Sequence, residues 1–166
     1  VAPGDRVLAG QPLLAIEGLH KSYGSGPRIL SDVSLRFAPG EFVVILGLSG
    51  AGKSTFLRCL NRLIDPSEGK IFVPRHLVMG GAAVAGSLDV VAMSARELRK
   101  WRRKVGMIFQ QFNLVKRLSV LQNVLSGSLG YQAWLPSTFR WFPSVERDRA
   151  LMNLERVGLL EQAYQR

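Results

Sequence analysis

Residues 41–61 have the sequence EFVVILGLSGAGKSTFLRCLN, and this stretch decides the fold. It opens with an apolar run over residues 42–46, which predicts a buried strand. The run ends at Gly47, and from Gly52 onward apolar side chains recur at the spacing of a helix. We therefore expect a strand, a tight loop and a helix, one after another.

The loop matches the pattern G-x-x-x-x-G-K-[ST], with its lysine and serine at Lys53 and Ser54. Glycines let the backbone turn sharply with its N–H groups inward, and the following helix adds its positive N-terminal end, so that backbone donors can hold a phosphate chain. Lys53 would neutralise the terminal phosphates. Ser54 would offer a hydroxyl to Mg²⁺, which takes only one or two oxygens from a protein of this kind. The pattern predicts a magnesium–nucleotide site; the alternative is a glycine-rich turn without a ligand.

Composition places the chain among ordinary globular proteins. Its 166 residues are 47% apolar and 20% charged, which is enough for one domain with a substantial core. The formal charge of +10 indicates an anionic partner, and nucleic acid, nucleotide and an acidic membrane surface all qualify. The single cysteine, Cys59, excludes an internal disulfide and a cysteine-based zinc site, so we expect it to pack in a core. With neither an 18-residue apolar window nor a secretory leader, we expect a soluble chain that is not exported.

The residues before the loop predict an antiparallel layer that leads into an α/β core. Residues 13–30 contain a short apolar strand, a turn rich in glycine and serine, and the start of a second strand near Ile29. Apolar and polar residues then alternate as far as Phe37, as in a half-buried strand. Tyr23 lies at the glycine-flanked turn, from which its ring could come round to stack on a nucleotide base. Taken alone, an aromatic residue at a turn is more often structural.

The residues after the loop carry a concentrated positive charge. Residues 70–73 predict another strand, and residues 74–93 an irregular hairpin or loop. A capping-box pattern from Ser94 to Glu97 opens a short helix that continues to Lys104 and contains six lysines and arginines. No aromatic stacking platform or base-reading motif accompanies these charges, so the sequence favours a solvated or phospholipid-facing helix over a nucleic-acid partner.

The last third of the chain is predicted to be mostly helical. An apolar run over residues 105–109 predicts one more strand. A second capping pattern, from Ser119 to Gln122, opens a helix, and residues 144–160 predict another. Between these helices, residues 131–143 carry five aromatic side chains.

Three motifs, in this order, resemble the nucleotide-binding subunits of ABC transporters: KSYG at residues 21–24, GLSGAGKST at residues 47–55 and VGMIFQ at residues 105–110. The stretches NLVKRLSVLQNVLSGSLG and ERDRALMNLERVGLLEQAYQR look especially like the phosphonate-import ATPases. The resemblance covers nearly the whole chain from about Leu14. The loop alone is specific only to P-loop NTPases, whereas the series of Tyr, P-loop and Gln is specific to the ABC class.

The resemblance implies an α/β fold: a P-loop NTPase core of the ABC type with an antiparallel β layer and the start of a helical subdomain, incomplete. Residues 1–12 would be an N-terminal extension and residues 13–166 the N-terminal part of the domain, with the helical subdomain from about residue 111. Leu48 stands where many relatives have proline, a change that should leave the backbone cradle intact. Nothing after Arg166 supplies the signature motif, Walker B aspartate, catalytic glutamate or switch histidine, so we expect a chain truncated before them.

The same resemblance assigns roles to individual residues. Tyr23 would stack on the adenine of ATP, Thr55 would touch its α-phosphate, and Gln110 would reach Mg²⁺ or the attacking water. Lys53 and Gln110 are then the catalytic residues, and Ser54 and Gln110 the contacts to Mg²⁺. The phosphates would be held by Gly47, Ser49, Gly50, Ala51, Gly52, Lys53, Ser54 and Thr55.

The function that follows is that of the ATP-binding subunit of an ABC importer, which couples ATP binding and hydrolysis to the uptake of phosphonate or a related small anion. We expect this chain to bind ATP and to lack the hydrolytic half. Its implied partners are a transmembrane permease, a second copy of the subunit and, indirectly, a periplasmic binding protein. Its implied place is the cytoplasmic face of the inner membrane, as a peripheral protein.

Aromatic residues near the glutamine-containing loop predict the surface that meets the permease: Phe112, Trp134, Phe139, Trp141 and Phe142. Two other functions stay open at this point. One is a non-catalytic nucleotide-binding remnant, which residues beyond position 166 would distinguish. The other is a small-molecule P-loop kinase, against which Tyr23 and Gln110 stand.

Overall fold

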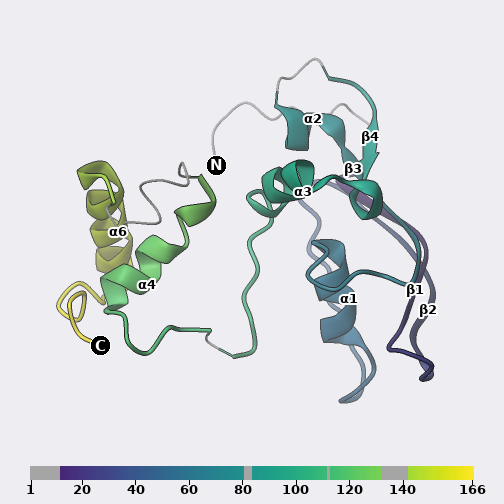
Figure 1. Cartoon of the computed structure of the whole chain (residues 1–166), viewed down its shortest axis with the longest axis horizontal. Helices are drawn as coiled ribbons and strands as arrows, with labels where there is room; N and C mark the ends of the chain where they lie inside the picture. The colour runs from purple at the N-terminus through teal and green to yellow at the C-terminus, as the bar shows by residue number, and fades with distance from the viewer. Residues whose placement is uncertain (1–11, 81–83, 112, 132–141) are drawn as a thin grey trace. The chain divides into compact units, whose positions relative to one another are not determined.

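The structure, a computed structural model, describes residues 12–80, 84–111, 113–131 and 142–166 (Figure 1). The chain divides into two compact units, Val1–Gly106 and Met107–Arg166. Within the described residues, no helix is long and apolar enough to cross a membrane.

The first unit is built on a four-stranded antiparallel sheet with the order β2-β1-β3-β4. The strands are β1 (Leu14–Ser22), β2 (Arg28–Phe37), β3 (Glu68–Pro74) and β4 (Ser87–Asp89). Ile16 of β1 lies opposite Leu35 on one side and Ile71 on the other. The predicted antiparallel layer is therefore confirmed, and the strand predicted over residues 70–73 is its third member.

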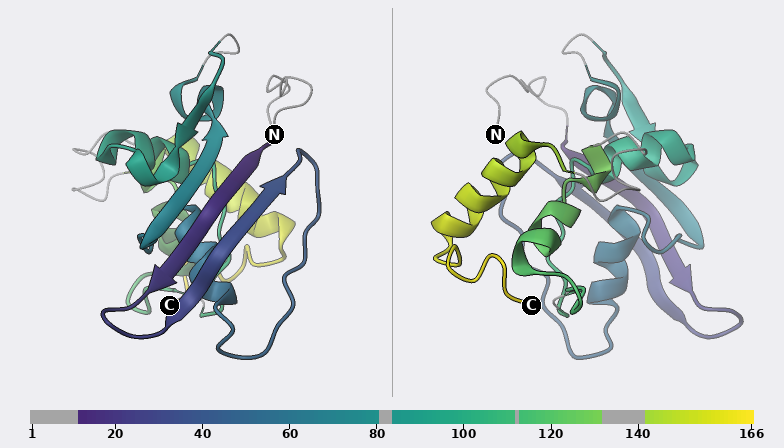
Figure 2. Two further views of the ribbon diagram at one scale, coloured as in Figure 1. Left: turned by 90° about the vertical axis from the view of Figure 1, so that its right-hand side faces the viewer. Right: turned by 60° about the vertical axis from the view of Figure 1, so that its left-hand side comes forward.

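Helices cover one face of this sheet (Figure 2). They are α1 (Lys53–Leu60), α2 (Arg75–Met79), the short 3-10 helix η1 (Val90–Ala92) and α3 (Ala95–Arg102). The sheet and the helices share one core, whose fully buried side chains include Ile16, Leu19, Ile71, Val73, Val90 and Cys59. Cys59 is thus a packing residue, as predicted, and burial raises the pKa of its thiol.

Hydrogen bonds from α3 fix the end of α1. Trp101 Nε1 donates to Leu60 O at 3.2 Å, and Arg102 Nε donates to Asn61 O at 2.9 Å. These donors satisfy carbonyl groups that the last turn of a helix leaves without an intrahelical partner. The helix that follows the glycine-rich loop is therefore anchored at its far end.

The prediction of a buried strand over residues 42–46 is wrong. These residues adopt no regular secondary structure and pair with none of the four strands of the sheet, and Phe42 and Leu46 are 89% and 88% exposed. An apolar run becomes a buried strand only where neighbouring strands accept its backbone hydrogen bonds and helices cover both of its faces. The run over residues 105–109 is likewise not a strand, and Ile108 is fully exposed.

Residues 74–93 are more regular than the sequence predicts. In the described part of this range α2 and η1 are helical, and β4 pairs with β3, Val73 lying opposite Leu88. The Asp89 carboxylate accepts from the N–H groups of Val91 and Ile71, at 2.9 and 3.2 Å. One side chain therefore joins the turn after β4 to the neighbouring strand, a contact that local sequence patterns do not reveal.

The second unit contains α4 (Val120–Ser126), the short η2 (Leu129–Tyr131) and α6 (Ser144–Arg156). Leu121 and Leu125 of α4 pack against Ala150 and Leu154 of α6. Both predicted capping boxes are present, that of α3 from Ser94 to Glu97 and that of α4 from Ser119 to Gln122.

The burial predicted for α6 is only partly right. The spacing over residues 144–160 predicts a helix whose inward residues are Val145, Leu151, Leu154, Val157 and Leu160. The helix instead ends at Arg156, and Val145, Val157 and Leu160 are 64%, 65% and 42% exposed. Leu154 is buried as the helical spacing predicts, and Leu151 packs against the second core. Each unit therefore has a core of its own.

Candidate functional site

The glycine-rich loop ends directly at the first residue of α1. Gly52 precedes the helix in the left-handed conformation, with φ of 84°, and no side chain of the described residues caps the helix there. The first intrahelical bond runs from Phe56 N to Gly52 O at 2.8 Å. The N–H groups of Lys53, Ser54 and Thr55 consequently have no helical acceptor and lie at the positive end of the helix. This is an arrangement suited to an anion.

Packing against β2 requires glycine at position 52. A Cβ atom there would lie 3.0 Å from both Ile29 Cγ2 and Ile29 O, closer than such atoms normally approach. The positive φ adds a second reason, because side chains other than glycine rarely adopt it. Strand β2 thus fixes where the loop turns, and the turn fixes where α1 starts.

Lys53 folds back over the loop. Its ammonium donates to Gly47 O and Leu48 O, both at 2.7 Å. The side chain therefore lies within the loop rather than out in solvent, and its positive charge lies beside the backbone donors. The loop itself, residues 47–51, is exposed. An approaching phosphate would meet backbone N–H groups, one ammonium and the hydroxyl groups of Ser54 and Thr55.

These residues fit a Mg²⁺-bound nucleotide. The left-handed glycines at positions 50 and 52 and the uncapped start of α1 provide backbone donors for phosphate. Ser54, exposed at the first turn of α1, offers the hard oxygen that Mg²⁺ takes from a protein. The described residues contain no cluster of three His, Cys, Asp or Glu side chains that could hold a metal by themselves.

Tyr23 belongs to the turn between β1 and β2. That turn lies at the same end of the first unit as the loop that leads into α1 (Figures 1 and 2). Tyr23 is 49% exposed, and the Lys21 ammonium lies 5.0 Å from the centroid of its ring. The structure therefore brings Tyr23 and the loop to one end of one unit. Lys21 has no role in the sequence-based site, although its spacing of two from Tyr23 at the end of a strand is the signal that could have indicated it.

Gln110 belongs to the second unit and is exposed, in the irregular segment between α3 and α4. The glycine-rich loop belongs to the first unit, and an approach of Gln110 to a Mg²⁺ ion bound there stays a prediction. Of the aromatic residues predicted to meet a permease, Phe112, Trp134, Phe139 and Trp141 lie outside the described residues. Phe142 is half-buried and packs against the core of the second unit. Core packing therefore accounts for an aromatic residue at this position without a permease interface.

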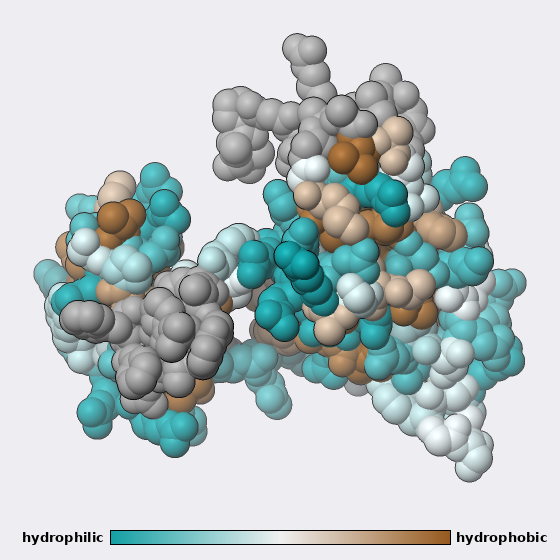
Figure 3. All heavy atoms as spheres, turned by 45° about the horizontal axis from the view of Figure 1, so that its top comes forward, coloured by the Kyte–Doolittle hydropathy of each residue, from teal (hydrophilic) through white to brown (hydrophobic). Residues whose placement is uncertain are grey.

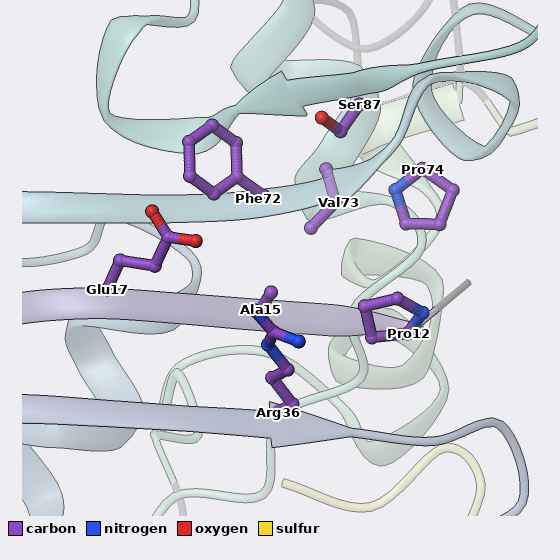
Figure 4. Close-up of a pocket in the computed structure, with 8 residues that line it drawn as sticks. All are labelled: Pro12, Ala15, Glu17, Arg36, Phe72, Val73, Pro74 and Ser87. Atoms are coloured by element: carbon purple, nitrogen blue, oxygen red, sulfur yellow. The ribbon is translucent and has the colours of Figure 1, made fainter. Parts of the chain in front are cut away.

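A different hollow lies on the other face of the sheet (Figure 4). It has a volume of about 430 Å³ and offers one carboxylate, Glu17, and one guanidinium, Arg36. No residue of the glycine-rich loop lines this hollow, and the candidate site is the loop before α1. The hollow is lined by Pro12, Ala15, Glu17, Arg36, Phe72, Val73, Pro74 and Ser87.

The family of the chain is given by comparison with known proteins. Residues 30–166 match the family model described as "ABC transporter". The chain is 46% identical over 154 residues to the phosphonates import ATP-binding protein PhnC 1 of Rhodopseudomonas palustris, and 45% identical over 154 residues to that of Halalkalibacterium halodurans. These alignments include 93% of this chain and 51% and 55% of the two relatives, so the chain spans about half the length of the curated relatives it matches.

Solved structures that resemble this chain are also ATP-binding cassettes or parts of ABC transporters. The ATP-binding cassette MJ0796, in a dimeric post-hydrolysis state bound to ADP and Pi, is 30% identical with a TM-score of 0.69, over 91% of this chain and 60% of that one. The structure of cbiO1 from Clostridium perfringens, part of the ABC transporter complex cbiONQ, is 25% identical with a TM-score of 0.63, over 93% of this chain and 53% of that one. The α/β fold with a partial P-loop NTPase core is thereby confirmed. The chain belongs to the ABC transporter family.

Proposed function

We propose that this chain is the ATP-binding part of an importer subunit and that it binds Mg²⁺-ATP at the loop before α1. The observation that carries the proposal is the Lys53 ammonium held 2.7 Å from two carbonyl oxygens of a loop whose helix starts without a cap. Membership of the family adds support, as do relatives that are named import ATP-binding proteins.

Each residue has a defined task in this proposal. Gly47 to Thr55 would hold the phosphates, with Lys53 neutralising charge and Ser54 reaching Mg²⁺. Gln110 would supply the second contact to Mg²⁺ or to water, and Tyr23 would stack on the base. The Mg²⁺ ion, when bound, supplies charge neutralisation at the phosphates. Residues 13–166 would form the N-terminal part of the nucleotide-binding domain, after an extension over residues 1–12, with the helical subdomain from about residue 111.

The wider role follows from the relatives. We propose phosphonate or a related small anion as cargo, because the similar proteins carry that name. A transmembrane permease and a second copy of the subunit would be direct partners, and a periplasmic binding protein an indirect one. The subunit would lie at the cytoplasmic face of the inner membrane. Support for the second copy comes from the dimeric state of a similar cassette.

We further propose that the 166-residue chain binds ATP without turning it over. The residues assigned to ATP donate hydrogen bonds or reach Mg²⁺, and none is a carboxylate that could orient water against the γ-phosphate. The test measures phosphate release from purified, monodisperse protein beside equilibrium binding of ATP. We expect saturable binding with release equal to that of buffer. Release that disappears in Lys53→Ala would contradict the proposal, and transfer of phosphate to a small acceptor would instead identify a kinase.

A further inference from the structure

One face of the Tyr23 ring is covered by a cation. The Lys21 ammonium lies 5.0 Å from the ring centroid, within the range of a cation–π interaction. Lys21 is on β1, and Tyr23 follows two residues later, in the turn directly after that strand. Tyr23 remains 49% exposed, which leaves part of its ring open.

A backbone carbonyl determines where this ammonium lies. Lys21 Nζ donates to Asp65 O at 2.6 Å, across 44 positions of sequence. A flexible lysine side chain is thus tied to the segment between α1 and β3 instead of sampling solvent. Its position over the ring is set by that segment.

Further hydrogen bonds fix that segment in turn. The Asp65 carboxylate accepts from Arg62 Nε at 2.8 Å, and Arg62 Nη1 donates to Val91 O and Met93 O at 3.1 and 2.9 Å. Ser67 N donates to His20 O at 2.9 Å, which ties the same segment back to β1. The carbonyl group that binds Lys21 therefore belongs to a segment that hydrogen bonds hold in place within the first unit.

We infer that Lys21 is a positioning residue for the nucleotide base. It covers one face of the Tyr23 ring, fixes the ring's orientation and leaves the opposite face as the stacking surface. A cation on one face also draws on the π electrons of the ring, which favours an electron-rich base such as adenine on the other. The inference rests on the proposed function, in which Tyr23 stacks on the base.

The test compares the affinity of the full chain for ATP with its affinity for inorganic tripolyphosphate, which has no base. Lys21→Met keeps the length of the side chain and removes its charge, and Lys21→Arg keeps a cation. Lys70→Met is the matched control, because Lys70 is an exposed lysine on β3, and the cation–π contact found in the described residues is that of Lys21 with Tyr23. We expect Lys21→Met to weaken ATP binding by roughly two- to fivefold. Tripolyphosphate affinity should be unchanged, and Lys21→Arg should restore ATP binding.

A double-mutant cycle separates the inference from the proposed function. Tyr23→Ala should weaken the binding of ATP and leave the affinity for tripolyphosphate unchanged. Adding Lys21→Met to Tyr23→Ala should cause no further loss of ATP affinity. Equal losses for ATP and tripolyphosphate in Lys21→Met would place Lys21 at the phosphates and overturn the inference. If Lys21→Met binds ATP normally and Tyr23→Ala binds it more weakly, the positioning role of Lys21 is overturned and the stacking role of Tyr23 stands. Normal ATP affinity in Tyr23→Ala would overturn that stacking role itself.

Discussion

At the scale of single residues, Lys53 already occupies the position that its proposed role requires. Its ammonium donates to Gly47 O and Leu48 O, which are neutral acceptors. A phosphate oxygen is ionised and makes a shorter, stronger bond with the same donor. Exchanging one carbonyl for a phosphate oxygen would therefore strengthen the contact while the side chain moves little.

Gly52 gives a prediction about the loop. Gly52→Ala places a Cβ 3.0 Å from Ile29 and forces alanine into the left-handed region, whereas Gly40→Ala has a similar φ of 76° and open space around it. The conformational cost alone is about 1–2 kcal/mol, so the free energy of unfolding of Gly40→Ala should fall by that amount. Gly52→Ala should lower the free energy of unfolding by more than Gly40→Ala does, and it should also weaken ATP binding. Chemical denaturation of both variants measures the difference, and equal losses would show that β2 does not press on the loop.

At the scale of helices and strands, the start of α3 should respond to acid. The Ser94 hydroxyl and the Ser94 N–H both donate to Glu97 Oε2, at 2.7 and 2.9 Å, and these bonds lower the pKa of that carboxyl. Because the pKa is lowered on folding, its contribution to stability is complete above the ordinary value of 4.5 and is lost as the pH falls through the folded value.

The second capping box is the internal control. Gln122 takes the place of the carboxylate at α4 and does not titrate. As the pH falls below 4.5, native-state hydrogen exchange should show protection falling in the first turn of α3 and not in that of α4. Glu97→Gln should remove the difference between the two helices. If both helices lose protection together in the wild-type chain, the carboxylate of Glu97 is not responsible.

Features that depend on near neighbours in sequence could be predicted, and features that depend on distant partners could not. The capping boxes at Ser94 and Ser119 and the β1–β2 hairpin are local, and all three are present. The run over residues 42–46 has the composition of a buried strand, but its conformation depends on partners that composition does not specify. At the site, sequence motifs indicated Lys53 and Tyr23 as candidate nucleotide contacts. The hydrogen bond between Lys21 and Asp65 joins residues 44 positions apart, so only the folded structure reveals it.

At the scale of the whole chain, several large apolar side chains lie exposed in the segments that were expected to be strands. Phe42, Leu46 and Ile108 are 89%, 88% and 100% exposed. On the face drawn in Figure 3, hydrophobic side chains reach the surface among hydrophilic ones. Large apolar side chains that stay exposed to water promote association. A formal charge of +10 opposes it by repulsion, which salt weakens.

We therefore predict self-association that increases with salt. Light scattering of the wild-type chain should rise as sodium chloride is added, and Phe42→Ser with Leu46→Ser should reduce the rise. The control pair, Met152→Ser with Val157→Ser, removes apolar side chains that are 57% and 65% exposed near the end of α6. Equal reductions in the two double variants would mean that total apolar surface matters, and not residues 42–46.

The central claim is that this chain binds Mg²⁺-ATP through Lys53, and calorimetric titration tests it most directly. A hydrogen bond to a charged group contributes about 1.5–3 kcal/mol, so Lys53→Ala should weaken ATP binding by roughly tenfold to a hundredfold. Lys70→Ala, which removes the same charge from an exposed position on β3, should bind as the wild-type chain does. Equal ATP affinity in the wild-type chain and in Lys53→Ala would contradict the account.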